Sequence, residues 1–232
     1  MVRKGRFFAV VTMMLILFGT ISVIAVTSTE KLSKSKSIKD SLPEKFTSEG
    51  INDRTAKMIL GKSYKQNSII EMDELRILTI TFLGFDDKPH YGKLIVNKKA
   101  ASELLVIFKE LYNSKFEIEK INLIDQYGAD DIMSMEDNNT SCFNFRTITN
   151  GKGVSKHSLG LAIDINPVQN PYINNEKTLP HKGRDYLVRN VEKKGMIIKG
   201  GTCYRIFKKH GWIWGGDWKR PVDYQHFERS AE

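Results

Sequence analysis

Two histidines and two aspartates in the C-terminal third of the chain have types and spacing that could do chemistry. His157 and Asp164 lie seven positions apart, and Asp223 lies three positions before His226. Two imidazole nitrogens and a carboxylate oxygen, from His157, Asp164 and His226, suit Zn²⁺, which binds such donors at about 2.0–2.2 Å. Three protein ligands leave a fourth position for water, as in catalytic zinc sites. The spacing therefore predicts a zinc centre, although each residue could also be a satisfied polar group of a core.

The segment that contains the first two candidates indicates how they are held. Residues 155–167 read SKHSLGLAIDINP, and their apolar members alternate as in a strand with one buried face: Leu159, Leu161, Ile163 and Ile165. A packed strand would hold Asp164 rigidly. Gly160 would let the chain fold closely between His157 and Asp164.

The remaining patterns alternate between helical and strand-like segments. Helices are predicted at 53–60 with Asp53 as the N-cap, at 98–113 with Asn97 as the cap, and at 203–211. Strands are predicted at 75–85, 94–96, 116–125 and 142–148, and loops at 128–141 and 166–190. This mixture predicts an α+β fold with a small mixed, mostly antiparallel sheet flanked by helices.

The start of the chain differs in composition from the rest. A cationic beginning precedes an uncharged stretch, Phe7–Val26, which at about 1.5 Å per residue in a helix is long enough to span a bilayer. Residues 1–28 are therefore predicted to be a signal peptide or an N-terminal membrane anchor, and the length favours the anchor. Residues 29–46 are predicted to be a flexible linker, and 47–232 the folded domain.

The overall composition is that of a globular protein, with 41% hydrophobic and 27% charged residues. The formal net charge is +9, but residues 1–40 hold seven Lys and Arg against two acids, so about half of the excess precedes the domain. No basic run is interleaved with aromatic residues, so nucleic acid is not an expected partner, and an anionic wall or membrane surface is favoured. After export, Cys142 and Cys203 could form a disulfide or remain small packing residues.

The motifs also resemble those of a known family. The signature of the M15 metallopeptidases is similar to two motifs here, Ser155-x-His157-x-x-Gly160-x-Ala162-x-Asp164 and Asp223-x-x-His226. The similarity extends from about Ile69 to the DYQHF of residues 223–227, roughly two-thirds of the chain. This family contains D-alanyl-D-alanine carboxypeptidases and dipeptidases and L-alanyl-D-glutamate endopeptidases, and its fold is similar to that of the hedgehog signalling domain. The resemblance implies such a fold over residues 47–232.

The resemblance also implies a role for each site residue. His157, Asp164 and His226 would be the zinc ligands. Asp223 would be the general base, which takes a proton from a zinc-bound water and returns it to the leaving amine. Arg146 would steady the substrate and the developing oxyanion, unless it serves a structural ion pair.

Weaker candidates complete the predicted site. Ser155 could bind substrate or form a turn. Trp214 could bind substrate and, with Trp218, line the cleft, or both could be core residues. The other three histidines, His90, His181 and His210, lie in a turn, a loop and a helix end, and are expected to have structural or surface roles.

The expected function is hydrolysis of peptidoglycan stem peptides outside the cytoplasmic membrane by a zinc peptidase, most closely a D-alanyl-D-alanine carboxypeptidase. The alternatives are an L-alanyl-D-glutamate endopeptidase, a non-catalytic zinc-containing wall-binding module, and an amidase that cuts the sugar–peptide link. The expected partners are the peptide stems and, through the N-terminal segment, the cytoplasmic membrane.

Overall fold

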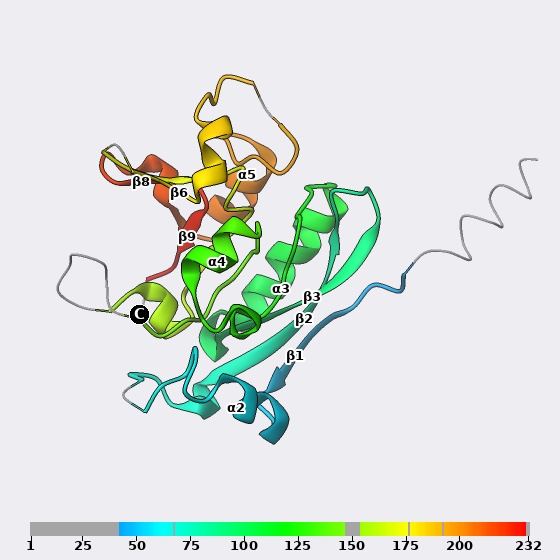
Figure 1. Cartoon of the computed structure of the whole chain (residues 1–232). Coiled ribbons are helices and arrows are strands. Elements are labelled where there is room, and N and C mark those ends of the chain that lie inside the picture. Colours follow the sequence, from blue (N-terminus) through cyan, green and yellow to red (C-terminus); the bar gives the residue numbers. More distant parts are fainter. Residues whose placement is uncertain (1–41, 67, 147–153, 176, 192, 231–232) are drawn as a thin grey trace, which may run out of the picture. The chain divides into compact units, whose positions relative to one another are not determined.

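In the computed structural model, the longest strands form one three-stranded antiparallel sheet (Figure 1). Its strands are β1 (Phe46–Gly50), β2 (Leu75–Leu83) and β3 (Pro89–Asn97), in the order β1-β2-β3. β2 and β3 pair along their whole lengths, from Leu75 opposite Asn97 to Leu83 opposite Pro89. The strands predicted at 75–85 and 94–96 are therefore present, and the second begins earlier than predicted.

The structure describes residues 42–66, 68–146, 154–175, 177–191 and 193–230. The predicted leader, 1–28, and most of the predicted linker lie outside these residues, and β1 begins at the last residue assigned to the linker. None of the helices in the described ranges has the length and apolar character that a membrane crossing requires.

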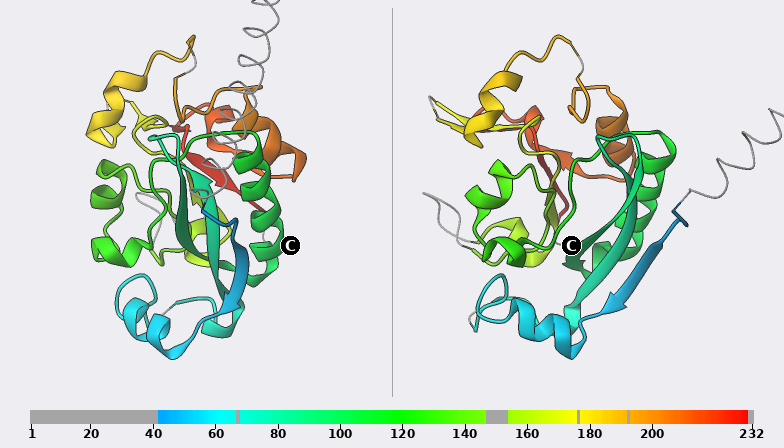
Figure 2. Two further views of the ribbon diagram at one scale, coloured as in Figure 1. Left: turned by 90° about the vertical axis from the view of Figure 1, so that its right-hand side faces the viewer. Right: turned by 45° about the vertical axis from the view of Figure 1, so that its right-hand side comes forward.

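The long helix α3 (Lys98–Asn113) lies along one face of this sheet (Figure 2). Asn97 ends β3 and caps the helix, because its Oδ1 accepts a hydrogen bond from the Lys99 N–H at 2.9 Å. The buried residues of α3 recur at helical spacing: Ala100, Ala101, Leu104, Ile107, Phe108 and Leu111. The predicted helix and its cap are both confirmed.

The first predicted helix needs a correction at its start. α2 spans Asp53–Ile59, and its N-cap is Asn52, whose Oδ1 accepts a hydrogen bond from the Thr55 N–H at 2.9 Å. Asp53 is the first helical residue, where its carboxylate still interacts favourably with the helix dipole. A short 3₁₀ turn, η1 (Met72–Glu74), then leads into β2.

The rest of the described chain has shorter elements. Two more three-stranded antiparallel sheets have the orders β4-β9-β7 and β6-β5-β8. Their strands are β4 (Ala162–Asp164), β5 (Tyr172–Asn174), β6 (Lys177–Leu179), β7 (Ile213–Trp214), β8 (Val222–Asp223) and β9 (His226–Glu228). The helices are α4 (Asp131–Glu136) and α5 (Thr202–Lys209), with 3₁₀ turns η2 (Ile124–Tyr127), η3 (Lys156–Leu159), η4 (His181–Tyr186) and η5 (Gly215–Asp217). The α+β class holds, but the described residues form three small sheets rather than one.

Two predicted strands are wrong. Residues 116–125 make only the isolated bridges Leu83 to Glu117 and Lys120 to Asn139, and then enter η2. Residues 142–146 have no strand, and 147–148 lie outside the described residues. Both segments bury apolar side chains, which explains their strand-like pattern. Their backbone groups, however, make single hydrogen bonds with separate segments and do not form a ladder. The predicted loop at 128–141 contains α4, which Asp130 caps through the Met133 N–H.

The predicted surface loop at 166–190 is partly a buried segment. Asn166 and Asn170 have no exposed surface. Asn166 Nδ2 donates to the carbonyls of Glu117 and Gly195, and Asn170 Nδ2 donates to those of Ile165 and Gly195. These hydrogen bonds satisfy backbone groups that a surface loop would leave to water.

The larger of two apolar clusters connects the β1-β2-β3 sheet with the β4-β9-β7 sheet. Leu78 and Phe108 from the first half cluster with Ile163, Phe207 and Phe227 from the second. The two cysteines are both buried with free thiols, so they pack as small residues and do not form a disulfide in this structure.

Candidate metal centre

Three donor side chains converge at the edge of the β4-β9-β7 sheet. His157 Nε2 lies 3.2 Å from Asp164 Oδ2, and His226 Nδ1 lies 3.0 Å from Asp164 Oδ1. The two imidazole nitrogens are 3.3 Å apart. Tetrahedral bonds of about 2.0–2.2 Å place donor atoms about 3.3–3.6 Å from one another, so this triangle fits a single small cation. His157, Asp164 and His226 are thus a group that can hold a metal ion.

Strand pairing brings two of the three donors together. In the antiparallel pair of β4 and β9, Asp164 lies directly opposite His226. Opposite residues in such a pair have Cβ atoms about 4.5–5.5 Å apart. The alternating pattern of 155–167 predicts a strand that holds Asp164, and β4 does hold it. The regular strand covers only Ala162–Asp164 of this segment.

His157 comes from the turn before this strand. It lies on η3, where the Ser155 Oγ accepts a hydrogen bond from the His157 N–H at 3.3 Å. Gly160 ends the turn with φ +63°, and a Cβ atom there would lie 2.6 Å from the Asn97 backbone nitrogen. The Gly160 carbonyl accepts from the Asn97 N–H at 2.9 Å. Only glycine allows both this backbone conformation and this close approach to β3.

Each histidine has its outer nitrogen occupied by a protein acceptor. His157 Nδ1 lies 2.6 Å from the Cys142 carbonyl oxygen, and His226 Nε2 lies 3.2 Å from Glu228 Oε2. Such partners fix the ring orientation and the tautomer, and leave the inner nitrogens, His157 Nε2 and His226 Nδ1, available to a metal. Sequence reasoning missed Glu228. Its position could have indicated the contact, because residues two apart on one strand lie on the same face and Glu228 follows His226 by two.

The metal-free site holds protons that a cation would displace. Burial opposes charge on His226, but its hydrogen bonds with Asp164 and Glu228 prevail and raise its pKa to about 10. Burial also acts to raise the pKa of Asp164, yet the two imidazoles hold that pKa well below its usual range. The carboxylate is therefore ionised and His226 protonated at neutral pH, and a metal must release the proton of His226 to bind there.

Asp223 stands beside this group. Burial, with the Asp164 carboxylate nearby, raises the pKa of Asp223 to about 7. Its Oδ1 atom is buried and has no hydrogen-bond partner among the described residues. Gly215 keeps this arrangement tight, because a Cβ there would lie 2.6 Å from the Asp223 carbonyl oxygen and 3.2 Å from the His226 Cβ. An unpartnered carboxylate oxygen next to three metal-type donors fits a site that receives a cation and a water.

Comparison with known proteins agrees with this geometry. The family model described as D-alanyl-D-alanine carboxypeptidase, of the M15 peptidases, matches residues 149–229, about a third of the chain. This segment is therefore similar to the M15 peptidases. The matched range contains His157, Asp164, Asp223 and His226, and the M15 resemblance of the motifs is confirmed. No curated protein and no solved structure gives a significant match.

The arginine expected from the M15 pattern is held by an ion pair. Arg146 Nε lies 2.5 Å from Asp131 Oδ2, and both side chains are about one-third exposed, at 32% and 31%. Asp131 Oδ1 in turn accepts from Asn144 Nδ2 at 2.9 Å. α4 thus fixes the guanidinium through Asp131. The ion pair and a substrate role are compatible, and the substrate role of Arg146 stays a prediction.

The two other predicted substrate contacts have structural partners. Ser155 caps η3, so its turn-forming role is present, and its contact with substrate stays a prediction. Trp214 is 3% exposed and packs in the core, with its Nε1–H donating to the Tyr224 carbonyl at 2.9 Å. Trp218 is partly exposed, and its ring centroid lies 5.3 Å from that of His226. Trp218 is therefore the tryptophan that borders the metal centre.

The other three histidines do not join the metal centre. His90 pairs with Asp86 at 2.8 Å, His210 pairs with Glu110 at 3.2 Å, and His181 is exposed at the start of η4. These positions agree with the structural and surface roles expected for them.

Proposed function

We propose that this protein is a zinc-dependent peptidase that hydrolyses peptidoglycan stem peptides, most closely a D-alanyl-D-alanine carboxypeptidase. The observation that carries the proposal is the convergence of His157, Asp164 and His226 beside the unpartnered carboxylate oxygen of Asp223. The M15 family match supports the peptidase class. We extend the proposal to the hedgehog-like fold that the family resemblance implies.

The chemistry follows from the positions of the side chains. When bound by the two histidines and Asp164, Zn²⁺ would lower the pKa of a coordinated water to about 7 and polarise the substrate carbonyl. Asp223 accepts the proton of the attacking water and passes it to the leaving amine. Its pKa of about 7 in the metal-free protein suits a base at neutral pH, and a nearby cation would lower that pKa and keep the group ionised.

Arg146 would then act on the substrate. Its ion pair with Asp131 on α4 is made through Nε and holds the guanidinium in place. A guanidinium fixed in this way suits the binding of a carboxylate or a developing oxyanion.

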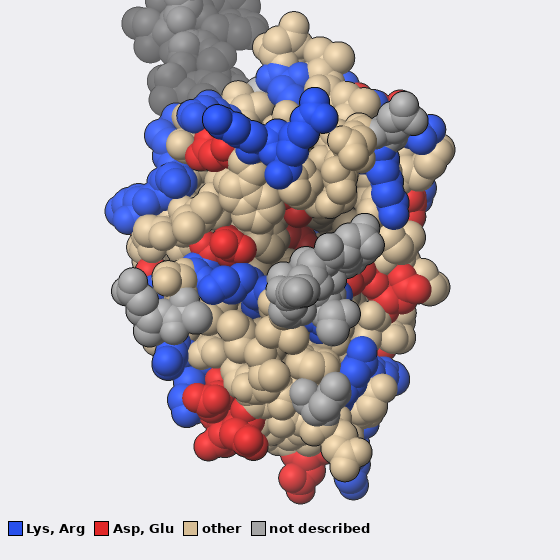
Figure 3. All heavy atoms as spheres, turned by 90° about the vertical axis from the view of Figure 1, so that its left-hand side faces the viewer, with Lys and Arg blue, Asp and Glu red and all other residues tan. Residues whose placement is uncertain are grey.

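The proposed setting is outside the cytoplasmic membrane, with the protein anchored by its N-terminal segment or secreted to the cell wall. The net charge of +9 would favour an anionic wall or membrane surface. Figure 3 shows Lys and Arg side chains gathered over the upper part of one face, above a hollow in which acidic side chains are visible. The peptide stems are the proposed substrate, and nucleic acid is not a proposed partner.

The test is to incubate the purified full chain with pentapeptide muropeptides and Zn²⁺ and to analyse the products by mass spectrometry. Loss of one terminal D-alanine supports the carboxypeptidase. Cleavage between L-alanine and D-glutamate, or of the sugar–peptide link, would overturn that assignment in favour of the endopeptidase or the amidase. No cleavage by zinc-loaded protein would favour the wall-binding module.

The variant Asp223→Asn separates the base from the metal centre. It should bind Zn²⁺ at the wild-type stoichiometry and lose about 10²–10⁴-fold in turnover, because the proton acceptor is gone. The matched control is Asp73→Asn, which removes a carboxylate from η1 in the first half of the chain and should leave turnover unchanged. Wild-type turnover in Asp223→Asn would contradict the proposed role of Asp223.

A further inference from the structure

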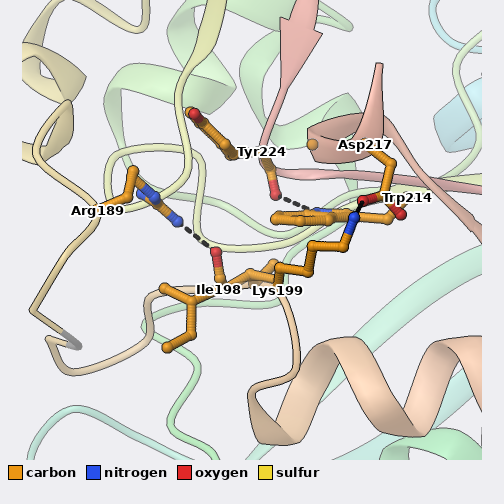
Figure 4. A pocket seen from close by; sticks show the side chains of 8 residues that line it. Arg189, Ile198, Lys199, Trp214, Asp217 and Tyr224 are labelled. Carbon is orange, nitrogen blue, oxygen red and sulfur yellow. Dashed lines mark hydrogen bonds and ion pairs between the residues drawn. The ribbon is translucent and has the colours of Figure 1, made fainter. Parts of the chain in front are cut away.

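A second candidate site lies next to the metal centre and is not explained by it. A pocket of about 390 Å³ is lined by Arg189, Ile197, Ile198, Lys199, Trp214, Gly216, Asp217 and Tyr224 (Figure 4). Pockets that bind small molecules have about this volume and combine apolar and aromatic walls with a few polar groups. Trp214, which is 3% exposed, is one of the residues that line this pocket.

The pocket shares two pieces of backbone with the metal centre. Gly216 follows Gly215, which packs against Asp223 and His226. Tyr224 follows Asp223 directly and is held from both sides, because its N–H donates to the Pro171 carbonyl and its own carbonyl accepts from Trp214 Nε1. A ligand in the pocket would therefore lie against the segment that carries the proposed base.

Arg189 gives the pocket an unneutralised positive charge. Its terminal nitrogens donate to the carbonyls of Gln169, Tyr186 and Ile197 and to Asn170 Oδ1, and its guanidinium carbon lies 4.3 Å from the Tyr224 ring centroid. No carboxylate among the described residues pairs with it, and its Nε is buried without a hydrogen-bond partner. Burial lowers the pKa of Arg189 to about 10, which reflects the cost of a charge whose only partners are neutral groups.

The second cation is already paired. Lys199 Nζ lies 2.8 Å from Asp217 Oδ1, and Figure 4 shows its side chain running beside Trp214 to reach that carboxylate. This pair is neutral as a whole, so the pocket carries a net charge of one positive unit from Arg189. A ligand with one negative charge and a small apolar part would complement both the charge and the walls of Ile197, Ile198, Trp214 and Tyr224.

We propose that this pocket binds a carboxylate-bearing amino acid or peptide group. If the proposed peptidase function holds, on which this last step rests, the ligand is a carboxylate of the stem peptide away from the bond that is cut, such as that of D-glutamate.

The probe is N-acetyl-D-glutamine, which has one free carboxylate, with N-acetyl-D-glutamine amide as its uncharged match, added to metal-free full-length protein. Binding is followed by calorimetry and by the NMR signals of the tryptophan indole N–H groups. The acid should bind and shift the Trp214 signal, and the amide should bind more weakly. Because no metal or hydrolysis is involved, this result is independent of whether the protein is a peptidase.

Two variants at the paired charges give opposite expectations. Lys199→Gln leaves Asp217 unpaired and should weaken binding of the acid about two- to fivefold, whereas Asp217→Asn should tighten it by a similar factor. Both side chains are exposed or partly exposed, at 74% and 27%, so neither change should unfold the protein. Arg189 is left intact because its hydrogen bonds hold three segments together.

The matched control is Lys209→Gln, which breaks the similar exposed ion pair between Lys209 on α5 and Glu110 on α3 and should leave binding unchanged. Equal binding of acid and amide, or equal effects of the variants at Lys199 and Lys209, would overturn the proposal. Binding of the acid together with an inactive enzyme would refute the peptidase and retain the carboxylate site.

Discussion

The two halves of the domain are built in different ways. Between Phe46 and Asn113, strands of up to nine residues pair along their whole lengths and a helix of sixteen residues covers them. From Val154 onward, the strands have two or three residues, and much of the order comes from single hydrogen bonds of buried side chains. All the donors of the candidate metal centre lie in the second half.

The difference shows how regular structure supports irregular structure. Asn97, at the end of the long β3, donates hydrogen bonds to the carbonyls of Leu159 and Gly160, the two residues that end the His157 turn. The first half therefore supplies a rigid edge, and the second half can use short strands and tight turns to aim its side chains. Stability should thus depend mainly on the first half, and metal binding on the second.

The strongest test of this division removes a ligand. His226→Ala should abolish Zn²⁺ binding and lower turnover by at least about 10³-fold, because two donors cannot hold the cation in place of three. Metal content is measured by elemental analysis, and the far-UV circular dichroism should stay close to that of the metal-free wild type. His210→Ala, which removes a histidine paired with Glu110, is the control and should keep the metal.

The opposite test creates a cavity in the first half. Leu104 has no exposed surface and packs from α3 into the core, so Leu104→Ala should lower the free energy of unfolding by about 2–5 kcal/mol. Urea unfolding of the metal-free protein measures this change. Val106, 48% exposed on the same helix, provides the control, and Val106→Ala should cost under about 1 kcal/mol. A loss of metal stoichiometry in folded Leu104→Ala protein would break the division of roles.

Metal affinity should rise with pH. Because the pKa of His226 is raised to about 10 in the metal-free protein, its proton must leave on binding at any lower pH. The apparent affinity for Zn²⁺ should therefore increase about tenfold per pH unit, or about a hundredfold from pH 7 to pH 9. Competition with a chromophoric chelator, corrected for the protonation of the chelator, measures it. A flat profile would show that His226 is already neutral.

The smallest effect is expected at the outer hydrogen bond of the site. Glu228→Ala removes the acceptor of His226 Nε2 and should weaken Zn²⁺ binding about 10–100-fold. Glu228→Gln keeps an acceptor without the charge and should fall between this variant and the wild type. Chelator competition gives both values. Wild-type affinity in Glu228→Ala would mean that strand pairing alone orients the imidazole.

The sequence predicted the regular half better than the irregular one, for physical reasons. Over 98–113, apolar spacing and the cap at Asn97 act together, and the structure has the same helix. Over 116–125, apolar residues are buried one by one while the backbone bonds to unrelated segments, so a strand pattern appears without a strand. The six-residue α4 was missed because its helical pattern is too short to distinguish from a polar loop.

The candidate site shows the same contrast. His157, Asp164, Asp223 and His226 were found because their motif is local, and the structure brings the three donor side chains together. Glu228 and the Cys142 carbonyl were missed because their contacts depend on strand register and on a backbone that runs beside the His157 turn. The Asp131 partner of Arg146 depends on the short α4 and was missed with it.

The pairing of Asp164 with His226 has a further consequence for how the second half stays folded. These residues are 62 positions apart, so a cation bound to both closes a long loop, as a disulfide would. By the chain-entropy estimate for cross-links, closing a loop of this length is worth about 4 kcal/mol at most. The bound ion would then contribute directly to the stability of the second half, which has the shortest strands. Chelation should open the loop between these residues to proteases first, while β1, β2, β3 and α3 remain protected.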